Sequence, residues 1–207
     1  MAGAQSVPDG LAGLRVLVAE DESLIRLDIV EMLAEGGHKV VGEAADGRTA
    51  VRLAGELRPD VVVMDVKMPD LDGLSAAEQI VAARLSAVVI LTAFSQRDLV
   101  ERAREAGVMS YLVKPFQKKD LLPALEMAVS RFGELVALER EVTDLSARLA
   151  ARTTIDRAKG VLQSEHGLSE PQAFRWIQRT AMDERSSMRA LAQQVLDGRG
   201  PEQGSPA

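Results

Sequence analysis

Asp60-Val-Val-Val-Met-Asp65 is a run of apolar, mostly β-branched residues between two aspartates, and it indicates the class of fold. Such a run lacks the polar alternation of a half-exposed strand and is typical of a strand covered on both faces. Residues 14–19 and 87–92 are almost wholly apolar in the same way, and 38–43 and 109–113 are further strand-like runs. We therefore expect five strands, the central ones buried in a parallel sheet.

Segments whose apolar residues have helical spacing separate these runs. They lie at 24–33, 48–57, 74–84, 96–106 and 118–132, and Gly36-Gly37 is a stop signal after the first. The alternation of strand and helix predicts an α/β domain, with a flavodoxin-like doubly wound five-stranded parallel sheet, over residues 14–130. Right-handed crossovers would place helices on both faces of this sheet.

A different pattern, that of a connecting helix, begins at about residue 131. Its apolar positions repeat at spacings of three and four, with charged residues between them: Leu135, Leu138, Val142, Leu145 and Leu149. This heptad seam over 131–151 has two interpretations. It is either a helical linker that packs on its own α/β domain, or a short coiled coil that joins two copies of the chain.

Residues 152–197 contain three amphipathic helical patterns and predict a small all-α three-helix domain. The apolar faces of the three helices are Ile155, Ala158 and Leu162; Ala173, Phe174, Ile177 and Ala181; and Met188, Leu191, Ala192, Val195 and Leu196. A unit of this size buries little core by itself, so we expect it to lean on the long helix or on a partner. The termini, 1–13 and 198–207, are expected to be disordered.

The composition excludes several classes of protein. A net charge of −6 argues against general coating of nucleic acid, but not against a local basic surface. The 207 residues include no cysteine, which excludes disulfides and thiolate metal sites. Because we find neither a signal-peptide pattern nor an apolar run long enough to cross a bilayer, we expect a cytoplasmic protein without membrane contact.

Polar side chains gather where the expected strands end. Glu20 and Asp21 follow the first strand, Asp65 and Thr92 end the third and fourth, and Lys114 follows the fifth. In an open parallel sheet these positions meet at one edge. Three carboxylates so close together repel one another and need a cation, and oxygen ligands without His or Cys favour Mg²⁺. The set predicts a phosphoryl-transfer site with Asp65 as the nucleophile, and the alternative is a group of solvated loop charges.

Four segments carry a resemblance to a known family: Val16-Leu-Val-Ala-Glu-Asp21, Val63-Met-Asp-Val-Lys-Met-Pro-Asp-Leu-Asp-Gly73, Leu91-Thr-Ala93 and Tyr111-Leu-Val-Lys-Pro-Phe116. Across residues 14–130 they resemble the receiver domain of two-component response regulators. The resemblance implies that a sensor histidine kinase phosphorylates Asp65, and that the chain is a phosphoacceptor regulator and not an enzyme. Glu20 departs from the pattern, because many receivers have Asp there, but it keeps the charge.

The resemblance also implies how Mg²⁺ is held. Asp21, Asp65 and the backbone carbonyl of Lys67 would bind the ion, and Glu20 would reach it through water. With its longer side chain, Glu20 is expected to alter the metal geometry slightly without loss of function.

A switch beside the phosphoryl group is implied as well, together with a cis peptide bond before Pro115. The phosphate-binding and switch residues would be Thr92, Ala93, Lys114 and Tyr111. Thr92 would move toward the phosphoryl group, and Tyr111 would fill the space it leaves. The alternative is that Tyr111 is an ordinary strand aromatic.

The C-terminal part carries a second resemblance, on Ala158-Lys-Gly160, Gly167, Ala173-Phe174, Ala181-Met182 and Ala192. These residues resemble the ANTAR domain, a family of three-helix modules that bind paired RNA hairpins and relieve transcription termination. The resemblance implies structured RNA as a partner, and an antitermination function that is controlled by phosphorylation.

The candidates for contact with RNA are five side chains: Arg152, Lys159, Arg175, Trp176 and Arg179. Lys159 belongs to the family motif. The helical period places Arg175, Trp176 and Arg179 opposite an apolar face, where an aromatic ring could stack on a base. The alternatives are that Trp176 packs against the receiver, the long helix or a second subunit, and that the basic residues are simply solvated.

Two other functions stay open at this point. A DNA-binding response regulator would need a basic recognition helix, and only Arg185 and Arg189 lie near the start of the third helix. A protein-interaction module of a phosphorelay would have no nucleic-acid role. We also expect that phosphorylation promotes a homodimer through the seam, Leu135–Leu149.

Overall fold

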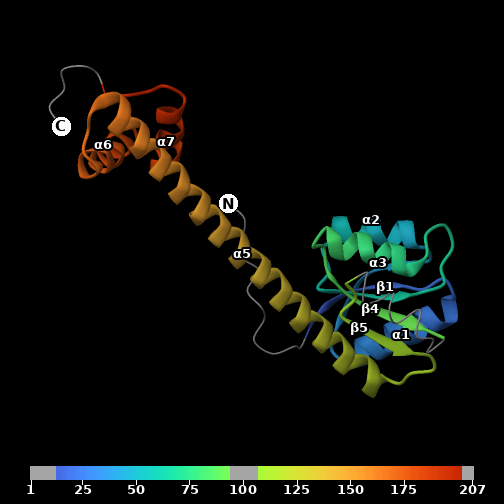
Figure 1. The fold of residues 1–207 in the computed structure, drawn as a ribbon. Coiled ribbons are helices and arrows are strands. Elements are labelled where there is room, and N and C mark those ends of the chain that lie inside the picture. Colours follow the sequence, from blue (N-terminus) through green and yellow to red (C-terminus); the bar gives the residue numbers. More distant parts are fainter. Residues whose placement is uncertain (1–12, 94–106, 202–207) are drawn as a thin grey trace. The chain divides into compact units, whose positions relative to one another are not determined.

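The protein divides into two units, Met1–Ala137 and Leu138–Ala207, called unit 1 and unit 2. The computed structural model describes residues 13–93 and 107–201, and Figure 1 shows the helices and strands of both units. Within these described ranges, no helix is long and apolar enough to span a bilayer.

Unit 1 is built on the parallel sheet that the apolar runs predicted. Its strands are β1 Arg15–Ala19, β2 Lys39–Ala44, β3 Val61–Asp65, β4 Ala87–Thr92 and β5 Ser110–Val113. They are ordered β2-β1-β3-β4-β5, and each neighbouring pair is parallel. β3 and β4 lie inside the sheet and are buried along their whole lengths. The prediction of the fold class is confirmed.

Helices cover both faces of this sheet (Figure 1). The helices are α1 Ser23–Glu35, α2 Gly47–Leu57, α3 Gly73–Ala82 and the first turns of α5 Lys118–His166. Side chains of α2 and α3 share one core with Leu17 and Met64, and those of α1 and α5 share the other with Val18 and Val63. The predicted helix at 96–106 lies outside the described residues.

The first helix ends as predicted, but its buried face is narrower than expected. Gly37, just beyond the helix, has φ of 78°, which favours glycine. Ile29 and Leu33, one turn apart, are fully buried, whereas Leu24 and Leu27 are 83% and 63% exposed. Apolar side chains thus lie on both sides of this helix, and only those turned toward the sheet enter the core.

The connecting helix is longer than predicted. α5 continues through Gly133 without a break. A Cβ atom added at Gly133 would have open space around it. The predicted linker over 131–151 and the first helix of the C-terminal domain are therefore one element. Four of the five seam residues are 52% to 67% exposed, namely Leu138, Val142, Leu145 and Leu149. The fifth, Leu135, is half-buried.

Unit 2 is a three-helix arrangement of the end of α5 with α6 Glu170–Asp183 and α7 Met188–Leu196. Its core residues are Ala158, Leu162, Ala173, Ile177, Ala181, Leu191, Ala192 and Val195. Phe174 is 42% exposed, and Trp176 packs against the edge of this core. The prediction that Phe174 faces the core and Trp176 faces away from it is therefore wrong. Successive residues turn by roughly 100° around a helix, so both aromatics fall on the flanks of the face that Ala173 and Ile177 define.

Candidate functional site

The sheet topology brings the predicted carboxylates together at the ends of β1 and β3. These strands are neighbours at the point where the strand order reverses, which is where open parallel sheets bind ligands. Glu20 and Asp21 directly follow β1, and Asp65 is the last residue of β3. One carboxylate oxygen from each of the three lies within 4.8 Å of the others. Glu20 and Asp65 are buried, while Asp21 is exposed, so the cluster opens to solvent on one side.

Lys114, which follows β5, bridges two of these carboxylates. Its Nζ lies 2.6 Å from Oε2 of Glu20 and 2.6 Å from Oδ1 of Asp65. Burial raises the pKa of Glu20, and the hydrogen bond from Lys114 only partly opposes this. Burial also acts to lower the pKa of Lys114, but its hydrogen bonds to Asp65 and Glu20 outweigh it, so the pKa of Lys114 is raised. The lysine therefore stays charged, and it supplies one positive charge against three carboxyl groups.

The loop after β3 fixes the orientation of Asp65. The backbone N–H of Lys67 donates a hydrogen bond of 2.6 Å to Oδ2 of Asp65. Gly73, the first residue of α3, packs so closely that a Cβ atom there would lie 1.8 Å from the carbonyl oxygen of Asp65. Asp72 caps α3 by accepting from the backbone N–H of Leu74 at 3.1 Å. The requirement for glycine at 73 was missed from the sequence, because the contact it avoids is with a residue in another element.

Arg26 of α1 is a second residue that the sequence did not single out. Its Nη1 donates a hydrogen bond of 2.5 Å to the backbone carbonyl of Glu20, and its Nε lies 3.2 Å from Oε2 of Glu43 on β2. The guanidinium therefore ties the turn that carries Glu20 to the neighbouring strand. Its position one turn into the helix after the acidic pair was the available signal.

The predicted switch residues lie at the ends of β4 and β5. Thr92 is buried at the end of β4, and Ala93 directly after it is exposed. The register partner of Tyr111 on β4 lies two residues before Thr92, so Tyr111 and Thr92 are on the same face of the sheet. The side chain of Tyr111 is 46% exposed. The Lys114–Pro115 peptide bond is cis, as the resemblance implied.

The predicted RNA-contact residues separate into two groups in unit 2, and the first group takes part in ion pairs. Nζ of Lys159 lies 2.8 Å from Oδ1 of Asp156 and 2.9 Å from Oε1 of Glu170, so it joins α5 to the first residue of α6. The hydrogen bond to Asp156 raises the pKa of Lys159, whose side chain is only 16% exposed. Nε of Arg152 lies 4.0 Å from Oδ2 of Asp156. Lys159 is therefore closely paired within the domain, whereas the side chain of Arg152 remains 85% exposed.

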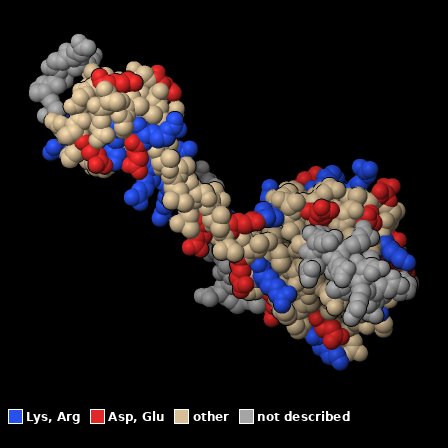
Figure 2. Space-filling view, in the orientation of Figure 1, with Lys and Arg blue, Asp and Glu red and all other residues tan. Residues whose placement is uncertain are grey.

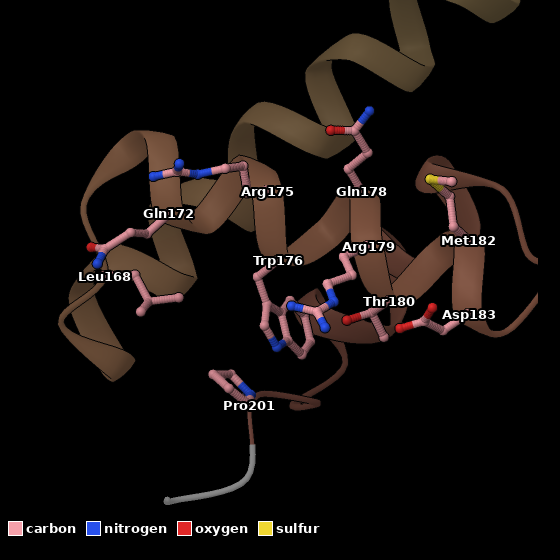
Figure 3. A pocket seen from close by; sticks show the side chains of 10 residues that line it. All are labelled: Leu168, Gln172, Arg175, Trp176, Gln178, Arg179, Thr180, Met182, Asp183 and Pro201. Atoms are coloured by element: carbon pink, nitrogen blue, oxygen red, sulfur yellow. The ribbon is translucent and has the colours of Figure 1, made fainter. Parts of the chain in front are cut away.

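The second group, Arg175, Trp176 and Arg179, lies on α6 and helps to line an open groove of about 890 Å³. Figure 3 shows the indole of Trp176 and the guanidinium of Arg179 on the side of α6 where Pro201 lies. Nε of Arg175 donates to the backbone carbonyl of Pro171 at 3.3 Å. The guanidinium of Arg179 has no hydrogen bond or ion pair with any residue that the structure describes.

Charge on the molecular surface is mixed. In Figure 2, basic and acidic side chains are interspersed over the visible face of each unit. Neither visible face is a broad single-sign surface, which agrees with the modest net charge of −6.

Comparison with known families identifies both parts of the chain. The model of the response regulator receiver domain matches residues 16–126, and the model of the ANTAR domain matches residues 143–196. The second match begins within the predicted linker. The chain is also 57% identical to the transcriptional regulatory protein PdtaR of Mycobacterium tuberculosis over 200 residues, which cover 97% of this chain and 98% of that protein.

Two more distant relatives match little more than half of the chain. The chemotaxis protein CheY of Thermotoga maritima is 36% identical over 114 residues, covering 55% of this chain and 95% of that protein. The solved receiver domain of the response regulator NarL from Mycobacterium tuberculosis has a TM-score of 0.55 at 29% identity, and the match covers 57% of this chain and 98% of that one. The match to the receiver domain, over residues 16–126, includes the carboxylate edge of the sheet.

Proposed function

Because the chain belongs to the response regulators that combine a receiver domain with an ANTAR domain, we propose that phosphorylation of Asp65 controls binding of structured RNA by unit 2. Phosphorylation of Asp65 is supported by the position of Lys114, whose Nζ lies 2.6 Å from Oδ1 of Asp65. A lysine held against the acceptor carboxylate neutralises charge on a phosphoryl group that is being transferred there.

The transfer itself is a displacement at phosphorus. A carboxylate oxygen of Asp65 attacks the phosphoryl group of a phosphohistidine on a sensor kinase, so that a P–O bond forms while the P–N bond breaks. The imidazole leaves and takes up a proton from solvent. Asp65 is oriented for this attack by the N–H of Lys67, and Lys114 carries the compensating charge.

The residues at this edge also fit a magnesium ion. The donor set consists of carboxylate oxygens from Glu20, Asp21 and Asp65, which a hard divalent cation prefers, and Lys114 alone does not balance their charge. Asp21, Asp65 and the backbone carbonyl of Lys67 would hold the ion, with Glu20 close by. Bound Mg²⁺ would screen the negative charge that accumulates on the phosphoryl oxygens.

The phosphorylated state would then be detected by Thr92, Ala93 and Tyr111. Thr92 ends β4 beside the acceptor strand, and Tyr111 shares its sheet face, so a hydroxyl drawn toward the phosphoryl group changes the space available to the ring. A phosphoryl group adds about 1.5–2 negative charges and three strong acceptor oxygens, which is enough to bias a two-state packing.

The same signal is proposed to promote a homodimer through the seam of α5. The seam residues Leu138, Val142, Leu145 and Leu149 are more than half exposed, although their spacing is that of a coiled coil. Sedimentation with and without beryllofluoride, a phosphoryl mimic, is expected to show association only in its presence. A monomer under both conditions contradicts this part of the proposal.

RNA binding is tested by comparing nucleic acids directly. In a filter-binding assay with Mg²⁺, a two-hairpin RNA should bind more tightly when beryllofluoride is added, and a duplex DNA of the same length should not bind. Asp65→Asn is the control, because its RNA binding should not respond to beryllofluoride. Preference for DNA would indicate a DNA-binding regulator, and binding to neither would leave a protein-interaction relay.

A further inference from the structure

We propose that the groove beside Trp176 on α6 is a binding site for an unpaired base of an RNA loop, with the adjoining phosphate at Arg179. The groove is lined by residues of α6 together with Leu168 and Pro201, which come from before and after the helix. This proposal rests on the proposed RNA-binding function of unit 2, and it names the part of the RNA that the domain would read.

The indole of Trp176 is held in place on one side and open on the other. The ring packs against the edge of the core formed by Ala173 and Ile177, yet it also lines the open groove (Figure 3). One part of the ring is therefore anchored, while another part stays accessible. A ring held in this way stacks on a flat ligand without losing further rotamer freedom, and bases stack on aromatic side chains in single-stranded recognition.

A positive charge lies next to this ring. Arg179 lies three residues after Trp176, so the two side chains are neighbours on the helix surface. Its guanidinium has no ionic partner among the described residues, whereas Lys159 and Arg199 of the same unit are paired with carboxylates. Asp183 lines the groove one turn further along α6 and would repel a phosphate there. The charges therefore favour the phosphate at Arg179.

The lining also distinguishes a base from an apolar peptide. Besides Trp176, it carries the amide of Gln172 and the charges of Arg179 and Asp183. An apolar segment would remove these groups from water without offering hydrogen bonds, at a considerable cost in free energy. A base offers flat apolar faces and a polar edge, which suits this mixture. Bases within a duplex are stacked and paired, so the site selects loops.

Trp176 is the only tryptophan of the chain, so its fluorescence reports on this groove in the unmodified protein. The full-length chain, with Mg²⁺ and beryllofluoride, is titrated with a two-hairpin RNA that has fixed stems and randomised loop sequences. A second RNA has the same stems but loops of abasic ribose. The first RNA should quench the fluorescence, and the abasic RNA should bind about 5- to 150-fold more weakly and leave the emission unchanged.

Two variants of Trp176 test the role of the ring. Trp176→Ala should lose about the same factor in affinity as removal of the loop bases, and Trp176→Phe, which keeps a stacking ring, should lose less. The matched control is Phe174→Ala, an aromatic on the other flank of α6, which should bind as the unmodified chain does. Circular dichroism of each variant shows whether unit 2 is folded, and the fluorescence titration needs no variant.

The outcomes separate the two proposals. Tight binding of the randomised-loop RNA that is unchanged with abasic loops, or that leaves the emission of Trp176 unchanged, overturns the base site and leaves RNA binding intact. Failure of the unmodified chain to bind the randomised-loop RNA contradicts both. Quenching by a peptide and not by RNA would assign the groove to a protein partner and refute the proposal.

Discussion

At the edge of the sheet in unit 1, the ammonium of Lys114 is held 2.6 Å from each of two carboxylates, whereas on α6 of unit 2 the guanidinium of Arg179 has no ionic partner among the described residues. The first arrangement joins residues that are far apart in the sequence, because strand ends from different parts of the chain meet at one edge. The second depends on neighbours along a single helix. The charged groups of the first site come from separate elements and offset one another. The second site is formed mainly by one helix and is open to solvent.

Because of this difference, substitutions in the two units should differ in the size of their effects. In unit 1 the charged groups are buried and interdependent, so removing one of them changes the environment of the rest. In unit 2 the residues that line the groove are not needed to compensate one another. Substitutions at the sheet edge should therefore have large effects on chemistry, and those on the helices of unit 2 should have smaller and separable ones.

The largest effect is expected from Asp65→Asn, which should abolish phosphorylation because the amide is not a nucleophile. Incorporation from phosphoramidate is measured by mass spectrometry of the intact chain. Asp70→Asn is the matched control, because Asp70 is exposed in the same loop and its φ of 62° is one that Asn tolerates. Equal labelling of Asp65→Asn and the unmodified chain would show that another residue accepts the phosphoryl group.

Next in size, Asp21→Asn should weaken Mg²⁺ binding at least about tenfold, because it removes a full charge from a cluster within 4.8 Å. Calorimetric titration of the full chain measures the affinity. Asp28→Asn, an exposed carboxylate on α1 outside the cluster, should leave the affinity nearly unchanged. If both variants bind Mg²⁺ as the unmodified chain does, the ion is held elsewhere.

A smaller effect is expected from Gly73→Ala, which places a methyl group 1.8 Å from the carbonyl oxygen of Asp65. The backbone must shift, and overpacking of this kind costs about 1–3 kcal/mol in the free energy of unfolding. Urea denaturation measures this loss. Gly55→Ala on α2 is the control, because nothing lies within 4 Å of its added Cβ and it should be neutral or slightly stabilising. Equal stability of the two variants would argue against the close approach at Gly73.

The smallest effect should come from Gly160→Ala in unit 2. Gly160 lies inside α5 with open space around its added Cβ, so alanine should stabilise the unit by about 0.5–1 kcal/mol. Thermal unfolding followed by circular dichroism detects the change. A loss of stability would mean that the helix needs glycine at this position for a reason other than space.

The strands and the sheet-edge residues could be predicted from the sequence, because burial on both faces leaves an unbroken apolar run. The five strand boundaries differ from the predicted ones by one residue or less. Contacts between elements could not be predicted in this way. The role of Arg26 depends on a backbone carbonyl, and that of Gly73 depends on a backbone in another element.

Helical patterns predicted the elements of unit 2 better than their faces. Apolar spacing identified α6 but placed Trp176 away from the core, because a stripe of small residues such as Ala173 and Ala181 leaves the exact direction of burial undefined. The ion pairs of Lys159 were hidden for a similar reason. Glu170, its partner on α6, is 11 positions away in the sequence, beyond the reach of helical spacing.

The exposed middle of α5 has a consequence for the local stability of the chain. The helix packs into a core at its beginning, through Leu121 and Leu125, and into another at its end, through Ala158 and Leu162, but residues 141–150 are all exposed. Helices without tertiary packing open readily, so amide hydrogen exchange should be slow at both ends and fast in between. A phosphoryl mimic that slowed exchange over 138–149 would locate the ordering event on this stretch, and uniform protection in the resting protein would show that the middle is already covered.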